Sequence, residues 1–458
     1  MKTLARRLST LHSDHRRIAR GAARVAFFLL LGKFAGAAKE MAVAYRYGVS
    51  NATDAYQFTM TMANWLPVTI VGVLAVVLIP VLVRVRYGDK ADWSRFVGEL
   101  QGWVMVLGVV LAVLIYALWP YVLDVAGHGL TDEARRMSRE LTLAFAPAAF
   151  LTLMTGISGA RLRAHERHIN TLLDSVPALS ILVLVLLAGS VRDVGPLLWG
   201  TLVGYLVQSV WLFWLASRAD GFRGRPRLTC RSERWPDLTR AAGVMLIGQV
   251  AMSFVGPIDQ YTAATLGSNA NATLGYAARL LSLVLGIGAA SVGRAALPVL
   301  ADIQGRGDAH HARAMALKWS ALMLLAGALA ALVGWLLAPW GVALLFQRGA
   351  FTAQNTQVVA HVLRWGLLQL PFYFGVLILV QLLASQNRYA IMAAIAVANF
   401  VLKAIMNYVL APSMGAAGIM LATSVMYALS YSCYVVVVLR LPAVSGGKAA
   451  SGSTHRPH

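Results

Sequence analysis

The sequence repeats its own order of turn signals about 220 residues later, and this duplication constrains the fold more than any other feature. Residues 48–53, GVSNAT, recur as residues 267–273, GSNANAT. The letters PVL occur at residues 80–82 and again at residues 298–300. Duplicated halves are typical of membrane transporters, because two similar bundles that rock around a shared cavity give alternating access. The repeat therefore predicts two equivalent halves and favours transport as the function.

Composition places the chain in the membrane. Hydrophobic residues make up 58% of it, charged residues 13%, and the mean hydropathy is +0.65. A soluble domain of this length does not have such a composition. Twelve apolar stretches are each long enough to cross a hydrocarbon core of about 30 Å, and their continuous apolar runs predict helices rather than alternating strands. The stretches lie near residues 25–47, 55–83, 100–123, 141–160, 170–190, 195–217, 241–266, 272–299, 315–344, 357–384, 389–411 and 414–439.

Basic residues gather on one side of the predicted spans. Seven precede the first span, and seven more lie in the loop between spans six and seven. By the positive-inside rule both termini are cytoplasmic, so the protein is an all-α membrane protein of about 12 transmembrane helices in two parallel six-helix repeats. The predicted parts are a basic cytoplasmic N-terminal segment (1–24), a six-helix bundle (25–217), a basic cytoplasmic linker (218–240), a second six-helix bundle (241–440) and a disordered tail (441–458).

The net charge of +21 suggests a negatively charged partner. The basic residues lie in loops beside membrane spans, which favours anionic lipid headgroups over nucleic acid. We therefore expect anionic membrane lipids as partners, no nucleic acid, and a monomer. Cys230 falls in a predicted cytoplasmic loop and Cys433 in the last span, so no disulfide framework is expected.

Charged residues inside the predicted spans are the candidates for function, because each costs at least about 2.5 kcal/mol there. Cations outnumber carboxylates, so a cavity between the halves is expected to prefer an anionic substrate. The candidate cations are Lys33, Lys39, Arg46, Arg279, Arg294, Arg364 and Lys403. The candidate carboxylates are Glu40, Asp54, Asp174 and Asp259.

The two lysines of the first span are six residues apart, which is about 9 Å along a helix and roughly 120° around its axis. A bend near Gly32 and Gly36 would bring both amines to one cavity. The alternative is that each lysine snorkels or pairs with a neighbouring carboxylate. For Arg294, Arg364 and Lys403 the alternative is a helix-tying contact.

The intramembrane carboxylates are also candidates for binding a coupling ion. Asp259 follows Gly256-Pro257, where a broken helix would expose backbone carbonyls, so we predict a proton or sodium site there. Glu40 and Asp174 are further candidates for ion coupling. Helix-packing hydrogen bonds are the alternative for Asp259.

Motifs for catalysis do not occur in this sequence. There is no Walker lysine loop, nucleophile elbow or Asp-rich metal motif, and residues 165–168 have metal-ligand residue types at the wrong spacing. We expect a transporter with no catalytic residues, no cofactor and no metal site.

Several motifs resemble the MurJ (MviN) lipid II flippases of the MOP superfamily. The first lie at residues 32–40, GKFAGAAKE, and at residues 47–48 and 52–56. Residues 275–280, GYAARL, resemble the family too, and the most specific match is LFQRGAFT at residues 345–352. The resemblance covers most of the chain, from about the first predicted span to the last.

This resemblance implies a MATE-like fold and a flippase. It would move a polyprenyl-diphosphate-linked saccharide from the cytoplasmic to the outer face of the bacterial inner membrane. In the family, cations of the first and eighth helices line the cavity that receives the diphosphate. Carried over to this chain, they are Lys33, Lys39 and Arg279, with Asp54 as a polar partner.

Departures from the family pattern keep other substrates open. The family usually has arginine at the positions of Lys33 and Lys39, and an arginine and a glutamate where this chain has Pro67 and Val71. It also tends to have fourteen helices rather than twelve. A flippase for exopolysaccharide or O-antigen repeat units is one alternative. A MATE-like exporter of drugs or cations is another, and a membrane glycosyltransferase is a third, from a different class.

Overall fold

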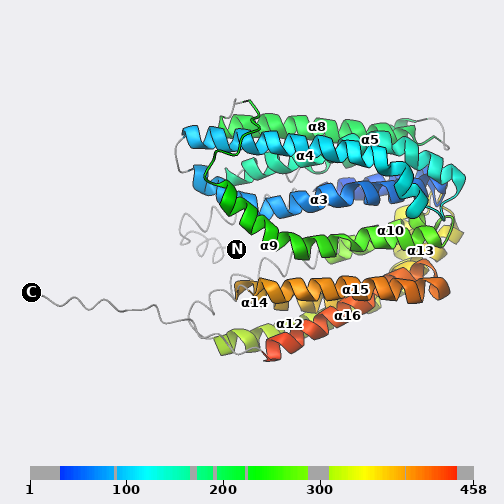
Figure 1. Cartoon of the computed structure of the whole chain (residues 1–458). Coiled ribbons are helices and arrows are strands. Elements are labelled where there is room, and N and C mark those ends of the chain that lie inside the picture. The colour runs from blue at the N-terminus through cyan, green and yellow to red at the C-terminus, as the bar shows by residue number, and fades with distance from the viewer. Residues whose placement is uncertain are drawn as a thin grey trace, which may run out of the picture. The chain divides into compact units, whose positions relative to one another are not determined.

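A computed structural model of the chain describes residues 31–86, 90–165, 173–188, 193–221, 225–286, 309–386 and 388–440. Within these ranges every regular element is a helix (Figure 1). Eight helical spans among the described residues are long and apolar enough to cross a membrane, and one of them, Ala353–Ser385, consists of two consecutive helices. The all-helical membrane fold is thereby confirmed. The predicted N-terminal segment and tail, like Arg294, lie outside the described residues.

Helix bounds extend several residues beyond most of the predicted spans, because polar first and last turns continue the apolar helix. Two helices span residues 31–47 and 270–286. The others are α3 (Asn51–Arg86), α4 (Lys90–Val125), α5 (Asp132–Ala164), α7 (Val176–Leu187), α8 (Gly195–Asp220), α9 (Trp235–Ser253), α10 (Val255–Thr265), α12 (Ala309–Phe346), α13 (Ala353–Leu367), α14 (Leu370–Ser385), α15 (Tyr389–Met414) and α16 (Ala416–Arg440).

The sequence repeat is matched by repeated helices. About 220 residues after α4, α5 and α8 come α12, the pair α13 and α14, and α16, with closely similar lengths. Gly48 and Gly267 occupy equivalent turns, and both have left-handed backbone conformations, with φ of 55° and 96°. Only glycine adopts this conformation at no steric cost, which explains why the turn signal recurs in the sequence.

Two spans predicted as continuous are interrupted, each just before a proline. Span seven is divided at Phe254 into α9 and α10, and Pro257 lies in the first turn of α10. Proline has no N–H for the carbonyl four residues earlier, here that of Ser253, and its ring clashes with it. Span ten is divided in the same way before Pro371, and the carbonyl of Gly366 accepts the backbone N–H of Gln369 there.

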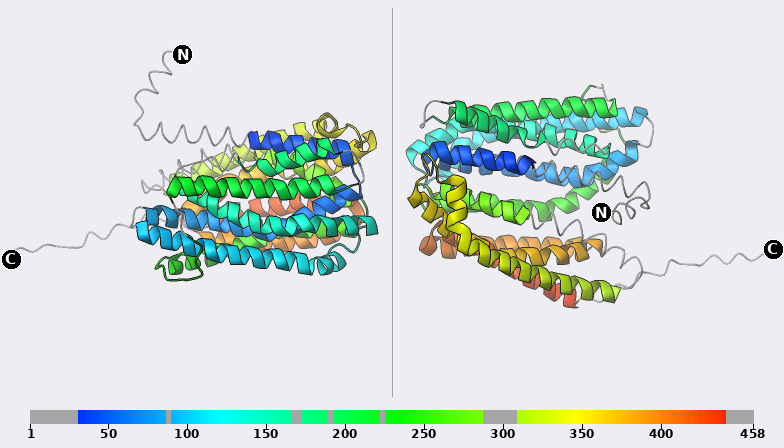
Figure 2. Two further views of the ribbon diagram at one scale, coloured as in Figure 1. Left: turned by 90° about the horizontal axis from the view of Figure 1, so that it is seen from above. Right: turned by 180° about the vertical axis from the view of Figure 1, so that it is seen from behind.

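The chain divides into two compact units. The first comprises residues 1–272 and 343–356, and the second comprises residues 273–342 and 357–458. In the first unit α5 packs along α3, α4 and α8, and α9 and α10 pack on α3 (Figures 1 and 2). In the second unit α16 packs along α14 and α15. The division of the repeats at the 218–240 linker stays a prediction.

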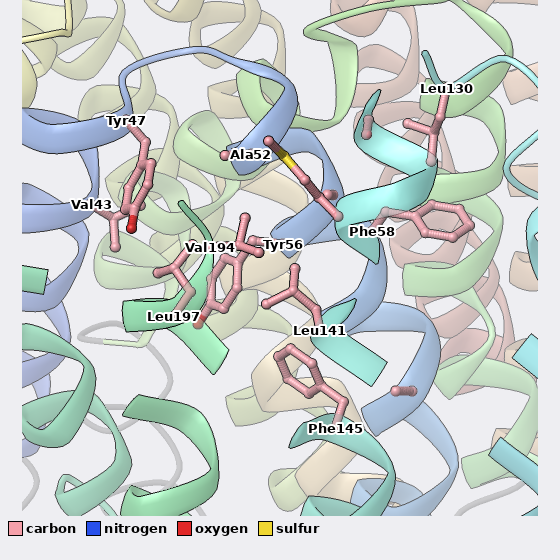
Figure 3. Close-up of a cluster of buried hydrophobic side chains, with 14 of the residues drawn as sticks. Val43, Tyr47, Ala52, Tyr56, Phe58, Leu130, Leu141, Phe145, Val194 and Leu197 are labelled. Atoms are coloured by element: carbon pink, nitrogen blue, oxygen red, sulfur yellow. The ribbon is translucent and has the colours of Figure 1, made fainter. Parts of the chain in front are cut away.

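A buried cluster in the first unit surrounds the start of α3. Figure 3 shows Tyr56 of this helix together with Phe145 of α5 and Leu197 of α8. The Tyr56 and Phe145 rings lie 6.0 Å apart. Tyr56 is fully buried, so packing holds its ring in place, and its hydroxyl lies within hydrogen-bonding distance of helix 31–47.

Candidate functional site

Lys39 is a buried cation on helix 31–47, with 7% of its surface exposed. Its Nζ lies 2.7 Å from Glu40 Oε1 and 3.4 Å from the Tyr56 hydroxyl. The ammonium also lies over the Tyr56 ring, 5.4 Å from its centre. A buried lysine of this kind needs a counter-charge, which Glu40 supplies from the next position in the chain. The pairing of Lys39 with a neighbouring carboxylate, which was the alternative to a cavity lysine, is therefore present.

Lys33 lies six residues earlier on the same helix and is half-buried. The helix runs without interruption from residue 31 to residue 47. Lys33 and Lys39 therefore differ in environment: one is partly open to its surroundings, and the other is enclosed by Glu40 and Tyr56. Tyr56 was not singled out in the sequence, although the repeat pairs it with Tyr276, and both are fully buried.

Asp54 is a buried carboxylate that binds the backbone of a distant turn. Its Oδ1 accepts the N–H of Ala272 at 2.6 Å, and its Oδ2 accepts the N–H of Asn269. These donors lie at the start of helix 270–286, where the first backbone N–H groups have no partner inside the helix. A carboxylate at this position also complements the positive end of the helix dipole. Asp54 therefore caps the helix that carries Arg279.

Arg279 lies in the third turn of helix 270–286 and is half-buried. It follows the fully buried Tyr276 and Ala277, which fix that face of the helix in the protein interior. The turn that Asp54 caps begins the helix on which Arg279 lies. Residues up to 272 belong to the first unit, and Arg279 belongs to the second.

Three other candidate cations bind backbone carbonyls of neighbouring helices. Arg46 Nη1 donates to Val185 O at 3.1 Å, at the end of α7. Arg364 Nε donates to Trp335 O at 3.0 Å, and the guanidinium lies over the Trp335 ring. Such bonds tie helices together, as the alternative interpretation expected for Arg364.

Lys403 is fully buried in α15, where its ammonium is bound by two acceptors of α16. Its Nζ donates to Ile419 O at 2.7 Å and to Thr423 Oγ1 at 2.6 Å. Asn399, one turn earlier, donates to Ser430 Oγ of α16 at 3.0 Å. A stripe of polar side chains on α15 thus faces α16 and holds the two helices together.

The other candidate carboxylates, Glu40, Asp174 and Asp259, each have a different environment. Glu40 pairs with Lys39. Asp174 was predicted to lie inside span five, but α7 begins only at Val176, and Asp174 is exposed in the preceding turn, where it accepts Gln208 Nε2 at 3.2 Å. Proline at position 177 suits the first turn of a helix, which explains the late start of α7.

Asp259 lies in α10, five residues after the interruption at Phe254, and is half-buried. The interruption therefore lies three residues before Pro257 rather than at Gly256-Pro257. Among the described residues no three His, Cys, Asp or Glu side chains are grouped as metal ligands.

A family model described as lipid II flippase MurJ matches residues 43–449 of this chain. Among curated relatives, a probable lipid II flippase MurJ of Synechocystis sp. is 27% identical over 440 residues, which cover 91% of this chain and 80% of the relative. The lipid II flippase MurJ of Burkholderia cenocepacia is 24% identical, with 88% of this chain and 80% of the relative covered.

Solved structures support the same fold. A lipid II flippase MurJ in an inward closed conformation superposes with a TM-score of 0.77 at 17% identity, covering 92% of this chain and 88% of the other. A multidrug resistance MATE family transporter of the MOP superfamily, in an inward-facing conformation, gives a TM-score of 0.70 at 16% identity, covering 88% of this chain and 94% of the other.

Proposed function

The chain belongs to the MurJ family of lipid II flippases, and from this premise we propose that Lys33, Lys39 and Arg279 bind the diphosphate of the transported lipid. Family membership makes the protein a multi-pass membrane transporter and not an enzyme, with lipid II as the implied substrate. The proposal concerns which side chains of this chain hold the headgroup.

The buried Lys39 is the observation that carries this proposal. An ammonium with 7% of its surface exposed is kept inside a membrane bundle at a considerable cost in desolvation. Its counter-charge Glu40 is the next residue of the same helix, and Glu40 Oε1 lies 2.7 Å from Lys39 Nζ. A diphosphate offers more negative charge and more acceptor oxygens than one carboxylate, and it would replace Glu40 as the partner of Lys39.

Asp54 has a supporting role in this proposal. By capping the first turn of helix 270–286 it fixes the start of the helix that presents Arg279. Arg46, Arg364 and Lys403 were also predicted to bind substrate. Their roles stay predictions, and their hydrogen bonds to helix backbones support a helix-tying contribution as well.

The proposal also includes the mode of transport, which is alternating access of the two halves. Both termini lie in the cytoplasm, and the protein is a monomer. Undecaprenyl-diphosphate carriers of exopolysaccharide or O-antigen units share the diphosphate with lipid II, so the cationic side chains would bind either class. Lysine at the positions where the family usually has arginine gives a point charge instead of a bidentate fork, which relaxes the geometry demanded of the diphosphate.

Reconstitution with defined substrates tests the proposal. The purified protein in liposomes is supplied with lipid II and with undecaprenyl-diphosphate saccharides of other composition, and appearance of the saccharide on the far side is measured. Lys39→Ala and Arg279→Ala are each expected to lower the rate about 10- to 100-fold, because a charge-assisted bond of about 1.5–3 kcal/mol is lost. Lys39→Arg keeps the charge and is expected to retain transport.

Lys318→Ala is the matched control, since Lys318 is an exposed lysine of α12. It should transport at the wild-type rate at equal expression. Normal transport by both Lys39→Ala and Arg279→Ala would show that these are packing charges. Export of an organic cation without movement of any lipid-linked saccharide would favour the MATE-like alternative.

A further inference from the structure

The segment between α8 and α9 is bound to α4 by a buried glutamate. We call residues 225–234, together with the Trp235 side chain, the strap. Glu99 of α4 is fully buried, and its carboxylate accepts four hydrogen bonds. The donors are Thr229 Oγ1 at 2.6 Å, Arg231 N at 3.0 Å, Ser232 N at 3.1 Å and Trp235 Nε1 at 2.9 Å. This number of donors satisfies a buried carboxylate and gives the strap one conformation.

Further hydrogen bonds hold the first part of the strap against α4. Arg227 N donates to Gly98 O at 2.9 Å, and Trp103 Nε1 donates to Thr229 O at 3.3 Å. A Cβ at Gly102 would lie only 2.2 Å from Arg227 O, so the strap approaches α4 as closely as glycine allows. The strap, which lies within the predicted linker, is therefore packed against α4 in the first unit.

The exposed apolar residues of α4 indicate where the strap lies relative to the hydrocarbon core. Helix α4 has 36 residues and is roughly 54 Å long, which exceeds a hydrocarbon core of about 30 Å. Its exposed apolar side chains begin with Trp103 and continue through Val106, Val110 and Val113. Tryptophan is enriched where the hydrocarbon meets the headgroups. Glu99, one turn before Trp103, therefore lies just outside the hydrocarbon.

The surface that the strap presents is basic. It contains four arginines and one glutamate, and residues 225–231 are all exposed. Arg234 is 4.0 Å from Asp92, whereas Arg225, Arg227 and Arg231 point to the surroundings as exposed side chains. Leu228, between them, is 63% exposed. An exposed leucine flanked by arginines suits the boundary between acyl chains and phosphates.

We propose that the strap is a binding surface for anionic phospholipid headgroups, and that Glu99 is the residue that positions it. Arg225, Arg227 and Arg231 bind the phosphates, and Leu228 enters the boundary with the acyl chains. Because Glu99 already orders the strap, little conformational entropy is lost when lipid binds. The proposal is independent of which saccharide the protein moves.

Cys230 gives a direct reporter, because it is exposed on the strap and the only other cysteine is Cys433. The full chain with Cys433→Ala is labelled at Cys230 with a fluorophore and placed in nanodiscs of phosphatidylcholine, with or without phosphatidylglycerol. Quenching by lipids that carry a quencher at the headgroup is measured. We expect stronger quenching when phosphatidylglycerol is present, and a loss of this difference at high salt.

Arginine variants test the binding surface. Arg225→Gln with Arg227→Gln is expected to lower the affinity for phosphatidylglycerol about five-fold for each arginine removed. Arg136→Gln with Arg139→Gln is the matched control, since both are exposed arginines of α5, on the predicted outer side. Equal quenching in neutral and anionic nanodiscs, or an equal loss in both double variants, would overturn the proposal.

Glu99→Gln separates positioning from charge. Removal of a negative charge alone strengthens the binding of anionic lipid, whereas loss of the anchor frees the strap and weakens it. We expect weaker binding and greater mobility of the Cys230 label. Thr229→Val removes one of the four donors and is expected to give a smaller change in the same direction. Stronger binding of anionic lipid by Glu99→Gln would overturn the positioning role of Glu99. Neither result changes what is expected of the Lys39 variants in the transport assay.

Discussion

Single buried charges in this protein are each matched by a partner of defined geometry. Lys39 pairs with Glu40, and Arg161 of α5 pairs with Asp220 at the end of α8. The second pair is bidentate, with Nε–Oδ2 at 2.7 Å and Nη2–Oδ1 at 3.0 Å, and both side chains are almost completely buried. Arg161 follows the predicted span 141–160 and would fall in a loop, yet in the fold it lies in α5 and joins that helix to α8.

Loss of the Asp220 carboxylate should therefore be severe. Asp220→Asn leaves the Arg161 guanidinium buried without its counter-charge, and the expected loss in the free energy of unfolding is about 3–5 kcal/mol. Thermal unfolding of the purified protein in detergent measures it. Asp92→Asn is the control, because Asp92 and Arg234 form a half-exposed pair at 4.0 Å, and at most about 1 kcal/mol is expected there. Equal effects of the two changes would contradict this prediction.

Helix ends are where the elements are fixed to one another. The start of helix 270–286 is capped by Asp54 of α3, and the start of α9 is fixed through Trp235 to Glu99 of α4. In both cases a carboxylate in one helix accepts donors from the turn that begins another. Unsatisfied N–H groups at helix starts make these turns suitable partners for a buried acid.

Asp54 variants test the cap. Asp54→Ala removes both acceptors and is expected to lower stability by about 1–2 kcal/mol, and Asp54→Asn, which keeps one acceptor oxygen, should fall between wild type and Ala. Protection of amides 269–272 from hydrogen exchange is the local measurement. Because the same turn begins the helix of Arg279, transport should decline in the same order. Unchanged exchange in Asp54→Ala would rule out the capping role.

At the scale of the whole molecule, the repeat produces reciprocal contacts between its two copies. A Cβ at Gly129, in the loop after α4, would lie 2.1 Å from Ala264 O at the end of α10. A Cβ at Gly349, in the loop after α12, would lie 2.2 Å from Tyr45 O at the end of helix 31–47. The loop after the third predicted span of each copy thus touches the end of the first span of the other. Both contacts lie in the first unit, which therefore includes residues 343–356.

Coupling of transport to an energy source is also a property of the whole molecule. We expect Asp259→Asn to transport more slowly and to lose the stimulation by one ion gradient. The helix is interrupted before Asp259, and Pro257 has no N–H to donate to the Ser253 carbonyl, so this carbonyl and the Asp259 carboxylate together could bind the coupling ion. The assay collapses the pH gradient, the sodium gradient and the membrane potential one at a time. Asp174→Asn and Glu40→Gln test the other two candidates. Unchanged gradient dependence in Asp259→Asn would leave the membrane potential as the simplest driver.

The sequence alone determined the membrane class, the helical spans, the repeat and the family resemblance. These follow from local pattern, since a bilayer core of about 30 Å demands apolar runs of a set length and the turns between them demand glycine at fixed positions. The helix interruptions at Phe254 and before Pro371 could also have been predicted from the sequence, because each precedes a proline.

Only the tertiary structure decided which distant partners Arg161, Glu99 and Asp54 have. Arg161 and Asp220 are 59 residues apart in the chain, Glu99 and Thr229 are 130 apart, and Asp54 and Asn269 are 215 apart. The periodicity of a helix relates only residues a few positions apart, so it does not indicate which of these side chains meet. Burial of a charge requires a partner wherever packing brings one within hydrogen-bonding distance, and packing of helices is decided by the whole chain at once.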